Sequence, residues 1–327
     1  MPAYNAAATV EAAVESILRQ TLAEFELVAV DDGSTDDTPD MLDSLSRSDS
    51  RIRVIHAPHG GIIPALNTGI AACEGDLIAR MDADDISHPK RLELQVGLMD
   101  ATPEVSVCSC LIRMFPRQSL LGGMVRYEQW LNSLVSHEEI ARDIFVESPI
   151  AHPSAVVRRG ELIEVGGYQE RGWAEDYDLW LRYHACGKRF EKVPRMLLCW
   201  RQLEGRLTFT DSRYSLENFL RAKAHYLARL LAPMNRLVIQ WGAGKTGRRI
   251  IKHLVREGVD IEAVIDIDPK KIGRLLRGRP IVSSHYLRGK QEAFVIAAVG
   301  SHGARELIRE QLRGLGFVEI RDFVCAA

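Results

Sequence analysis

Three carboxylates stand close together directly after an apolar run. Asp82, Asp84 and Asp85 follow Leu77-Ile78-Ala79, so we expect them where a buried strand reaches the surface. Such a density of negative charge costs Coulomb repulsion unless a cation lies nearby. Carboxylate oxygens suit hard divalent cations, and Mg²⁺ or Mn²⁺ often bridges one or two carboxylates to a diphosphate. The alternative interpretation is an acidic loop on a solvated surface.

A second acidic pair, Glu175-Asp176, opens an apolar-periodic segment that we predict to be a helix. Free backbone amides and the helix dipole keep a carboxylate at a helix start ionised, which suits a proton acceptor. Asp176 is therefore our candidate general base, and we expect Glu175 beside it to orient the acceptor. A further pair, Asp31-Asp32, ends the strand-like run 25–30.

Together with Pro2-Ala3-Tyr4-Asn5, these acidic stretches resemble the family 2 glycosyltransferases, which carry the GT-A nucleotide-sugar fold. The resemblance covers roughly residues 1 to 210, with the motifs in family order. It implies that Asp84 is a direct ligand of Mn²⁺ or Mg²⁺, and that Asp82 lies near the ribose or reaches the metal through water.

The resemblance also implies a donor-binding set at the start of the chain. Tyr4 would stack on the base, with Asn5 beside it, and Asp32 would accept a hydrogen bond from the base or ribose. Arg201 would reach a phosphate of the donor. These residues imply a nucleotide-sugar donor, with a UDP-sugar as our expectation.

Two features depart from the family pattern. Leu203, in Trp200-Arg201-Gln202-Leu203, stands where many relatives have a histidine near the metal, and His152 is either its substitute or a structural histidine. Met1 occupies the last position of the family's first strand. We expect that the chain starts late, at an internal methionine; the alternative is a domain that lacks a core strand.

Alternating strand and helix patterns predict an α/β domain over residues 1–232, the GT-A unit with its first strand truncated, built on a mainly parallel sheet. Ligands of such sheets bind beyond the carboxyl ends of the strands, where Asp32 and Asp82 both fall.

Residues 233–327 predict a separate, small Rossmann-like domain. Gly242, Gly244 and Gly247 follow an apolar strand and open a helix, and Asp266 stands where a ribose-binding acid would. These four residues form a candidate nucleotide site. The segment holds only four predicted strands, so an interaction or regulatory module is the other interpretation.

The overall composition limits the classes of partner and the cellular location that we expect. A formal net charge of -2 gives no electrostatic argument for nucleic acid. No apolar run approaches the roughly 20 residues of a spanning helix, so we expect no transmembrane segment. Six dispersed cysteines indicate reduced thiols and a cytoplasmic protein. Peripheral contact with the inner membrane face and homo-oligomerisation stay open.

The sequence thus predicts an inverting, metal-dependent glycosyltransferase. It would move a sugar from a nucleoside-diphosphate carrier to a hydroxyl of a glycan or lipid-linked acceptor, in surface polysaccharide synthesis. One alternative is a degenerate, non-catalytic scaffold or nucleotide sensor built on the same folds. Another is a nucleotidyltransferase, but no glycine-rich, lysine-containing phosphate loop opens the chain, and that reaction would not need Asp176.

Overall fold

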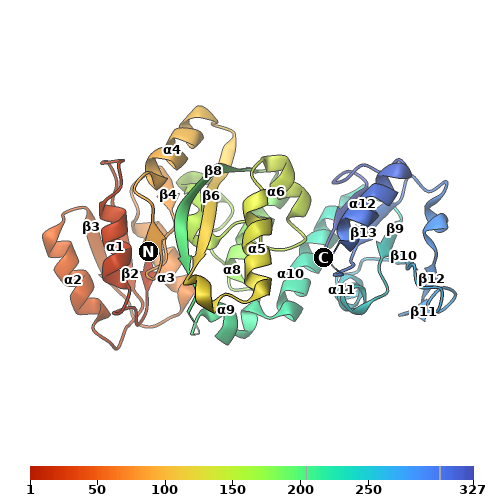
Figure 1. Ribbon diagram of the computed structural model, residues 1–327, viewed down its shortest axis with the longest axis horizontal. Helices are drawn as coiled ribbons and strands as arrows, with labels where there is room; N and C mark the ends of the chain where they lie inside the picture. Colours follow the sequence, from red (N-terminus) through yellow and green to blue (C-terminus); the bar gives the residue numbers. More distant parts are fainter. Residues whose placement is uncertain (204, 302) are drawn as a thin grey trace. The chain divides into compact units, whose positions relative to one another are not determined.

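The computed structural model describes residues 1–203, 205–301 and 303–327, and the chain divides into two compact units (Figure 1). Unit 1 comprises Met1–Ile140, Pro149–Arg171 and Glu175–Phe209; unit 2 comprises Ala141–Ser148, Gly172–Ala174 and Thr210–Ala327. The chain passes from unit 1 to unit 2 for the last time between residues 209 and 210, whereas the sequence predicts the boundary between residues 232 and 233. Helix α10 (Leu216–Leu231) belongs to unit 2 because it packs against α11 (Lys245–Arg256).

The first part of unit 1 is a three-stranded parallel sheet in the order β1-β2-β3. All five residues of β2 are buried, as expected for a parallel strand covered on both faces. Helix α1 buries Val10, Ala13, Val14 and Ile17, the spacing of one helical face. The elements are β1 (Pro2–Ala3), α1 (Val10–Leu18), β2 (Leu27–Asp31), α2 (Thr38–Ser48), β3 (Ile52–His56) and α3 (Ile62–Ala72).

The second part of unit 1 is a five-stranded mixed sheet in the order β4-β7-β6-β8-β5. Only β6 and β8 pair in parallel, so the prediction of a mainly parallel sheet is wrong here. The antiparallel pairs involve strands of two or three residues, which are too short to show periodicity. The elements are β4 (Leu77–Ala79), β5 (Ile86–Ser87), α4 (Arg91–Ala101), β6 (Val105–Phe115), α5 (Gly122–Ser133), β7 (Val156–Arg158), α7 (Arg159–Glu164), α8 (Glu175–Ala185) and β8 (Arg189–Arg201).

Helix α6 (His137–Asp143) begins in unit 1, and its last three residues are assigned to unit 2. The main sheet of unit 2 has the order β11-β12-β10-β9-β13-β14. From β12 to β14 its strands are parallel, and the chain starts at the central β9 and fills first one side and then the other. The elements are β9 (Val238–Trp241), β10 (Ile261–Ile265), β11 (Leu275–Leu276), β12 (Arg279–Val282), β13 (Phe294–Ala297), α12 (Ala304–Gly314) and β14 (Phe323–Cys325).

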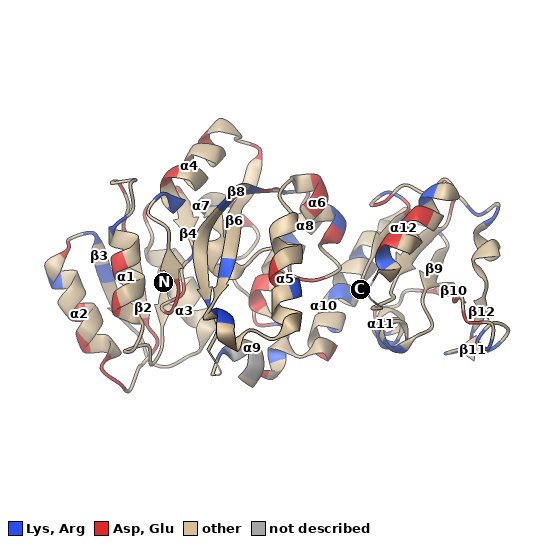
Figure 2. Cartoon of the chain, viewed as in Figure 1, with Lys and Arg blue, Asp and Glu red and all other residues tan. Residues whose placement is uncertain are grey.

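Charged residues of both signs are interspersed on helices such as α6 and α12 (Figure 2), in keeping with the net charge of -2. Among the described residues, none of the helices combines the length and apolar character needed to cross a bilayer.

Candidate active site

An acidic cluster lies between the end of β4 and the start of β5. Asp82, Asp84 and Asp85 each have one carboxylate oxygen that lies within 4.8 Å of such an oxygen of the other two residues. Asp85 is fully buried; one of its oxygens accepts a hydrogen bond from the Arg201 amide (2.7 Å), and the other has no hydrogen-bond partner among the described residues. The sequence had suggested Asp84 and Asp82 as metal ligands, and the structure adds Asp85 to that group.

The electrostatics of this cluster favour a cation. Burial, and then the Asp82 charge, raise the pKa of Asp84 to about 6, and the same causes raise the pKa of Asp85 well above its usual range. Asp82 forms an ion pair with the buried guanidinium of Arg80. Three carboxylates thus lie together; they offer hard oxygen ligands, and one buried oxygen of Asp85 has no hydrogen-bond partner among the described residues. This set fits Mn²⁺ or Mg²⁺.

Strand β5 joins the acidic cluster to the end of β8. Ile86 pairs with Cys199, which brings Arg201 beside the acids. Arg201 Nε donates to the Asp84 carbonyl (2.5 Å), and its guanidinium lies 4.5 Å from the centre of the Phe115 ring. Arg201 therefore lies beside the acidic cluster, and its contact with a donor phosphate stays a prediction.

A second cation, Arg206, was missed from the sequence. It donates to the Arg201 carbonyl (3.1 Å) and lies over the Trp200 ring at 4.7 Å. Its charge opposes the upward shift in the pKa of Asp84. Leu203, which replaces the histidine of many relatives, is 44% exposed and brings no metal ligand.

The candidate base lies at the start of α8. Burial, and then the neighbouring Glu175 carboxylate, raise the pKa of Asp176 to about 7. One Asp176 oxygen accepts from the Tyr177 amide (2.7 Å), which opposes this shift only in part. The expectation that the helix start keeps this carboxylate fully ionised was therefore too simple, because desolvation outweighs the helix amides.

His152 and Tyr168 lie next to the Glu175-Asp176 pair. The imidazole Nε2 lies 2.5 Å from the Tyr168 hydroxyl, and Nδ1 lies 4.0 Å from a Glu175 oxygen. Burial, and then the Arg80 charge, hold the pKa of His152 well below its usual range, so the ring is neutral near pH 7. His152 is thus a buried polar partner of the acidic pair, and nothing places it as a substitute metal ligand.

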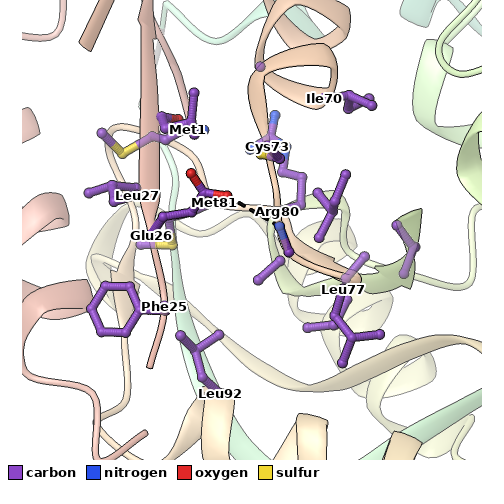
Figure 3. Close-up of a pocket in the computed structure, with 18 of the residues that line it drawn as sticks. Met1, Phe25, Glu26, Leu27, Ile70, Cys73, Leu77, Arg80, Met81 and Leu92 are labelled. Carbon is purple, nitrogen blue, oxygen red and sulfur yellow. Dashed lines mark hydrogen bonds between the residues drawn. The ribbon is translucent and has the colours of Figure 1, made fainter. Parts of the chain in front are cut away.

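Arg80 links the two acidic groups. It pairs with Asp82, and its charge also opposes the raised pKa of Asp176. Figure 3 shows Arg80 in the wall of a cavity of about 460 Å³ that lies inside unit 1. Sequence reasoning passed over Arg80 and Tyr168. A signal for Arg80 exists: an arginine directly after an apolar strand and two residues before Asp82 needs a nearby anion if it is buried.

Tyr4 and Asn5 lie on the turn after β1. The Tyr4 ring is 47% exposed and stacks on His59, with ring centroids 4.2 Å apart and an interplanar angle of 22°. Asn5 has a positive φ of 48°; its amide donates to Ser34 Oγ (2.9 Å) and its side-chain oxygen accepts from the Thr35 amide (2.8 Å). Asn5 therefore holds this turn, and the accessible ring is Tyr4.

Asp32 is buried directly after β2, and its carboxylate forms hydrogen bonds within the protein. Its two oxygens accept from the amides of Gly60 and Gly61, both at 2.9 Å. His59 Nδ1 also lies 2.9 Å from the oxygen that accepts from Gly61. A contact of Asp32 with the donor stays a prediction.

The tail glycines form a tightly packed turn. A Cβ on Gly247 would lie 1.9 Å from the Gly242 carbonyl oxygen, and one on Gly242, whose φ is +121°, would lie 2.7 Å from the Ala298 carbonyl oxygen, whereas Gly244 has open space. Asp266 accepts from the Ala243 amide (2.9 Å) and pairs with Lys271 (3.1 Å). Packing alone thus explains two of the glycines, and internal partners occupy the acid expected to bind a ribose.

Comparisons with known proteins show which proteins the chain resembles. The chain is 29% identical over 191 residues to the amylovoran biosynthesis glycosyltransferase AmsE of Erwinia amylovora, an alignment that covers 58% of this chain and 68% of that protein. The structure of S. aureus TarS 1-349 in complex with UDP-GlcNAc superposes with a TM-score of 0.57 at 19% identity, over 78% of this chain and 70% of that one.

A second structural neighbour is the mannosyltransferase PcManGT of Pyrobaculum calidifontis, solved with GDP-Man and Mn2+. Its TM-score is 0.50 at 19% identity, over 79% of this chain and 68% of that one. At these identities the two structures show a shared fold. The model of glycosyl transferase family 2 matches residues 1–166, just over half of the 327 residues. The chain is a glycosyltransferase and belongs to glycosyl transferase family 2.

Proposed function

We propose that this glycosyltransferase transfers a sugar from a UDP-sugar to a hydroxyl group of a glycan or lipid-linked acceptor, with inversion at the anomeric carbon and with Mn²⁺ or Mg²⁺ bound. The observation that carries this proposal is the half-buried Asp176 carboxyl beside the buried Glu175, where desolvation and the Glu175 charge raise the pKa of Asp176 to about 7. A base whose pKa lies near the working pH is deprotonated in a large fraction of the molecules and still binds a proton strongly. The pKa values of general bases in enzymes are commonly shifted to this range.

In this mechanism the ionised Asp176 takes the proton of the acceptor hydroxyl as the oxygen attacks the anomeric carbon. The bond to the diphosphate breaks on the opposite face, which inverts the configuration. Glu175 orients the acceptor, and Arg201 and Arg206 offset charge on the departing phosphates. Asp84 and Asp82, with Asp85, would hold the metal, which neutralises the diphosphate when bound.

At the donor end, Tyr4 stacks on the base, Asn5 fixes the turn that carries Tyr4, and Asp32 fixes the Gly60-Gly61 loop beside it. TarS bound to UDP-GlcNAc supports a UDP-sugar over the GDP-Man of PcManGT, by its higher TM-score alone. The name of AmsE supports an acceptor in polysaccharide synthesis. A cytoplasmic location of the reaction stays a prediction. We propose unit 2 as an interaction or regulatory module, because internal contacts occupy Asp266.

Titration calorimetry with UDP tests the proposal. We expect binding that requires Mn²⁺ or Mg²⁺, is lost in EDTA, and weakens at least about tenfold in Asp84→Ala, because a lost ligand leaves the diphosphate poorly neutralised. The matched control is Asp40→Ala, an exposed acid on α2. UDP affinity that is equal in EDTA and in Asp84→Ala would refute metal-dependent donor binding.

A further inference from the structure

A tight hairpin forms one end of the unit 2 sheet. Strand β11 is the outermost strand of that sheet, and among the described residues it pairs with β12 alone. Leu276 lies opposite Arg279, so only Arg277 and Gly278 connect the two strands. Both connecting residues have a positive φ, 51° and 80°, as the type I′ turn of a two-residue hairpin requires. The tip of this hairpin is therefore narrow.

Arg277 stands at a backbone position that disfavours it. A left-handed backbone suits glycine, asparagine or aspartate, and it costs free energy for a longer side chain. The turn itself is held by Arg279, whose Nη1 donates to the Arg277 carbonyl (2.9 Å) and whose Nη2 pairs with Asp260 (3.3 Å). The Arg277 side chain is exposed and forms no hydrogen bond or ion pair within the described residues. The turn thus presents an arginine that its own stability does not require.

The residues before the turn add further charge and apolar surface. Lys270 and Arg274 are also exposed, and their side chains form no ion pair in the part of the chain that the structure describes. Leu275, between the two arginines in sequence, is 69% exposed, and Ile272 is 38% exposed. Charges on an edge strand alone protect it from pairing with another chain. That protection does not explain an exposed leucine among them, since an apolar side chain favours association.

We propose that this basic hairpin, residues 270–279, docks unit 2 on an anionic phospholipid surface (Figure 2 shows its Lys and Arg residues in blue near β11 and β12). The exposed cations would meet lipid phosphates, and Leu275 would enter the boundary between headgroups and acyl chains. The inference rests on the proposal that unit 2 is an interaction module, and it does not depend on the identity of the sugar donor or acceptor.

Other partners fit the basic hairpin less well. A second copy of the chain that paired along β11 would bring arginines of like charge together, which is unfavourable. A stable protein interface buries about 800 Å² on each partner, whereas a two-residue tip offers a narrow surface. Single-stranded nucleic acids bind to cations interleaved with aromatic rings, and residues 270–279 contain no aromatic side chain. A lipid surface is soft and can adapt to a narrow tip.

Co-sedimentation of the full chain with vesicles tests the proposal. We expect at least about tenfold tighter binding to phosphatidylcholine vesicles that contain about one quarter phosphatidylglycerol than to pure phosphatidylcholine vesicles. Arg277→Asn should weaken binding to the anionic vesicles about fivefold, the contribution of one cation at such a surface. Its thermal midpoint should stay equal or rise, because asparagine suits the turn. Leu275→Ser should also weaken binding, by about fivefold or more, because an apolar group no longer leaves water.

Matched controls lie on α12, which connects the two strands at the opposite end of the sheet. Arg313→Asn changes a 57% exposed arginine and Leu307→Ser a 60% exposed leucine, and both variants should keep full vesicle binding. Equal binding to neutral and anionic vesicles would overturn the proposal. So would unchanged binding in Arg277→Asn, or controls that weaken binding as much as the hairpin variants do.

UDP affinity, measured on the same preparations, separates this proposal from the proposed donor. It should be the same in the unaltered chain and in all four variants, because none of the four residues lies in unit 1. A chain that binds anionic vesicles through the basic hairpin but does not bind UDP would refute the proposed donor and support this surface. A chain that binds UDP but not anionic vesicles would refute this surface and leave the donor in place.

Discussion

The two carboxyl groups at the start of α8 share one desolvated environment. The Glu175 charge therefore disfavours ionisation of Asp176, in addition to the effect of burial. His152 is neutral beside them and cannot supply a compensating positive charge. The nearest cation that acts on Asp176 is Arg80, whose charge is already paired with Asp82. This arrangement keeps Asp176 basic without leaving it fully protonated at neutral pH.

Replacing Asp176 by asparagine removes the proton acceptor and keeps the side-chain shape. We expect the rate of sugar transfer to fall by about 10²-fold or more, with UDP affinity within a factor of about two, because a base contributes to the reaction step and not to donor binding. Transfer assays and calorimetry on the same preparation measure both quantities. Asp260→Asn, at an exposed acid, is the control. Near-normal transfer in Asp176→Asn would move the base elsewhere, with Glu175 next to be tested.

The raised pKa of Asp176 also predicts a pH dependence. Transfer should rise with pH through an apparent pKa near 7, as Asp176 loses its proton. Stability should change in the opposite sense: a raised carboxyl pKa favours folding at low pH, and this contribution is lost as the pH rises through 7. Glu175→Gln removes the neighbouring charge and should move the kinetic pKa downward, whereas Glu164→Gln, at an exposed acid, should not. An unchanged profile in Glu175→Gln would show that the two groups are not coupled.

At the scale of elements, the sequence predicted what has strong periodicity and missed what depends on tertiary contact. The strand-like run 25–30 predicted β2 to within two residues at each end. Strands β5 and β7 have two and three residues, and only their partners define them. The acidic cluster was visible as a motif, but Arg206 reaches it only because β8 folds back along β5.

The loop after β3 illustrates an element held by one side chain. Asp32→Asn replaces an oxygen that accepts from Gly60 or Gly61 with an amide group that cannot, so a buried donor loses its partner. We expect a loss of about 1–3 kcal/mol in the free energy of unfolding, measured with urea. Asp37→Asn is the control, since Asp37 is exposed and its side chain makes no capping hydrogen bond at α2. An unchanged stability with weaker UDP binding would instead assign Asp32 to the donor.

At the scale of the whole molecule, unit 2 is built from more than the tail. Asp143, at the end of α6, is buried and pairs with Arg309 of α12, which also contacts Glu319 at 2.7 Å. The Lys223 ammonium of α10 donates to the Val146 carbonyl at 2.6 Å. A boundary at 232/233 would separate Asp143 from Arg309, so we expect a chain ended there to lose stability.

Arg309→Met tests this internal network directly. It leaves the Asp143 carboxylate buried with weaker partners, and we expect unit 2 to lose about 3 kcal/mol of stability, the lower end for a broken buried pair, because Arg142 still pairs with Asp143. The control is Arg313→Met, which removes a 57% exposed arginine paired with the same Glu319. Separate unfolding transitions of the two units, followed by hydrogen exchange, measure the loss. Equal effects of the two substitutions would show that burial of the Asp143 pair contributes nothing.

The division of the chain also bears on how such a protein can be recombined. The backbone passes between the units five times, at residues 140/141, 148/149, 171/172, 174/175 and 209/210. A gene fusion that replaces everything after residue 209 would keep two short segments of unit 2, 141–148 and 172–174. These two segments would still have the sequence that packs with the original residues 210–327. The second piece ends directly before Glu175. Exchange of this tail between relatives should therefore succeed only when those eleven residues are transplanted with it, although the two units share no sheet.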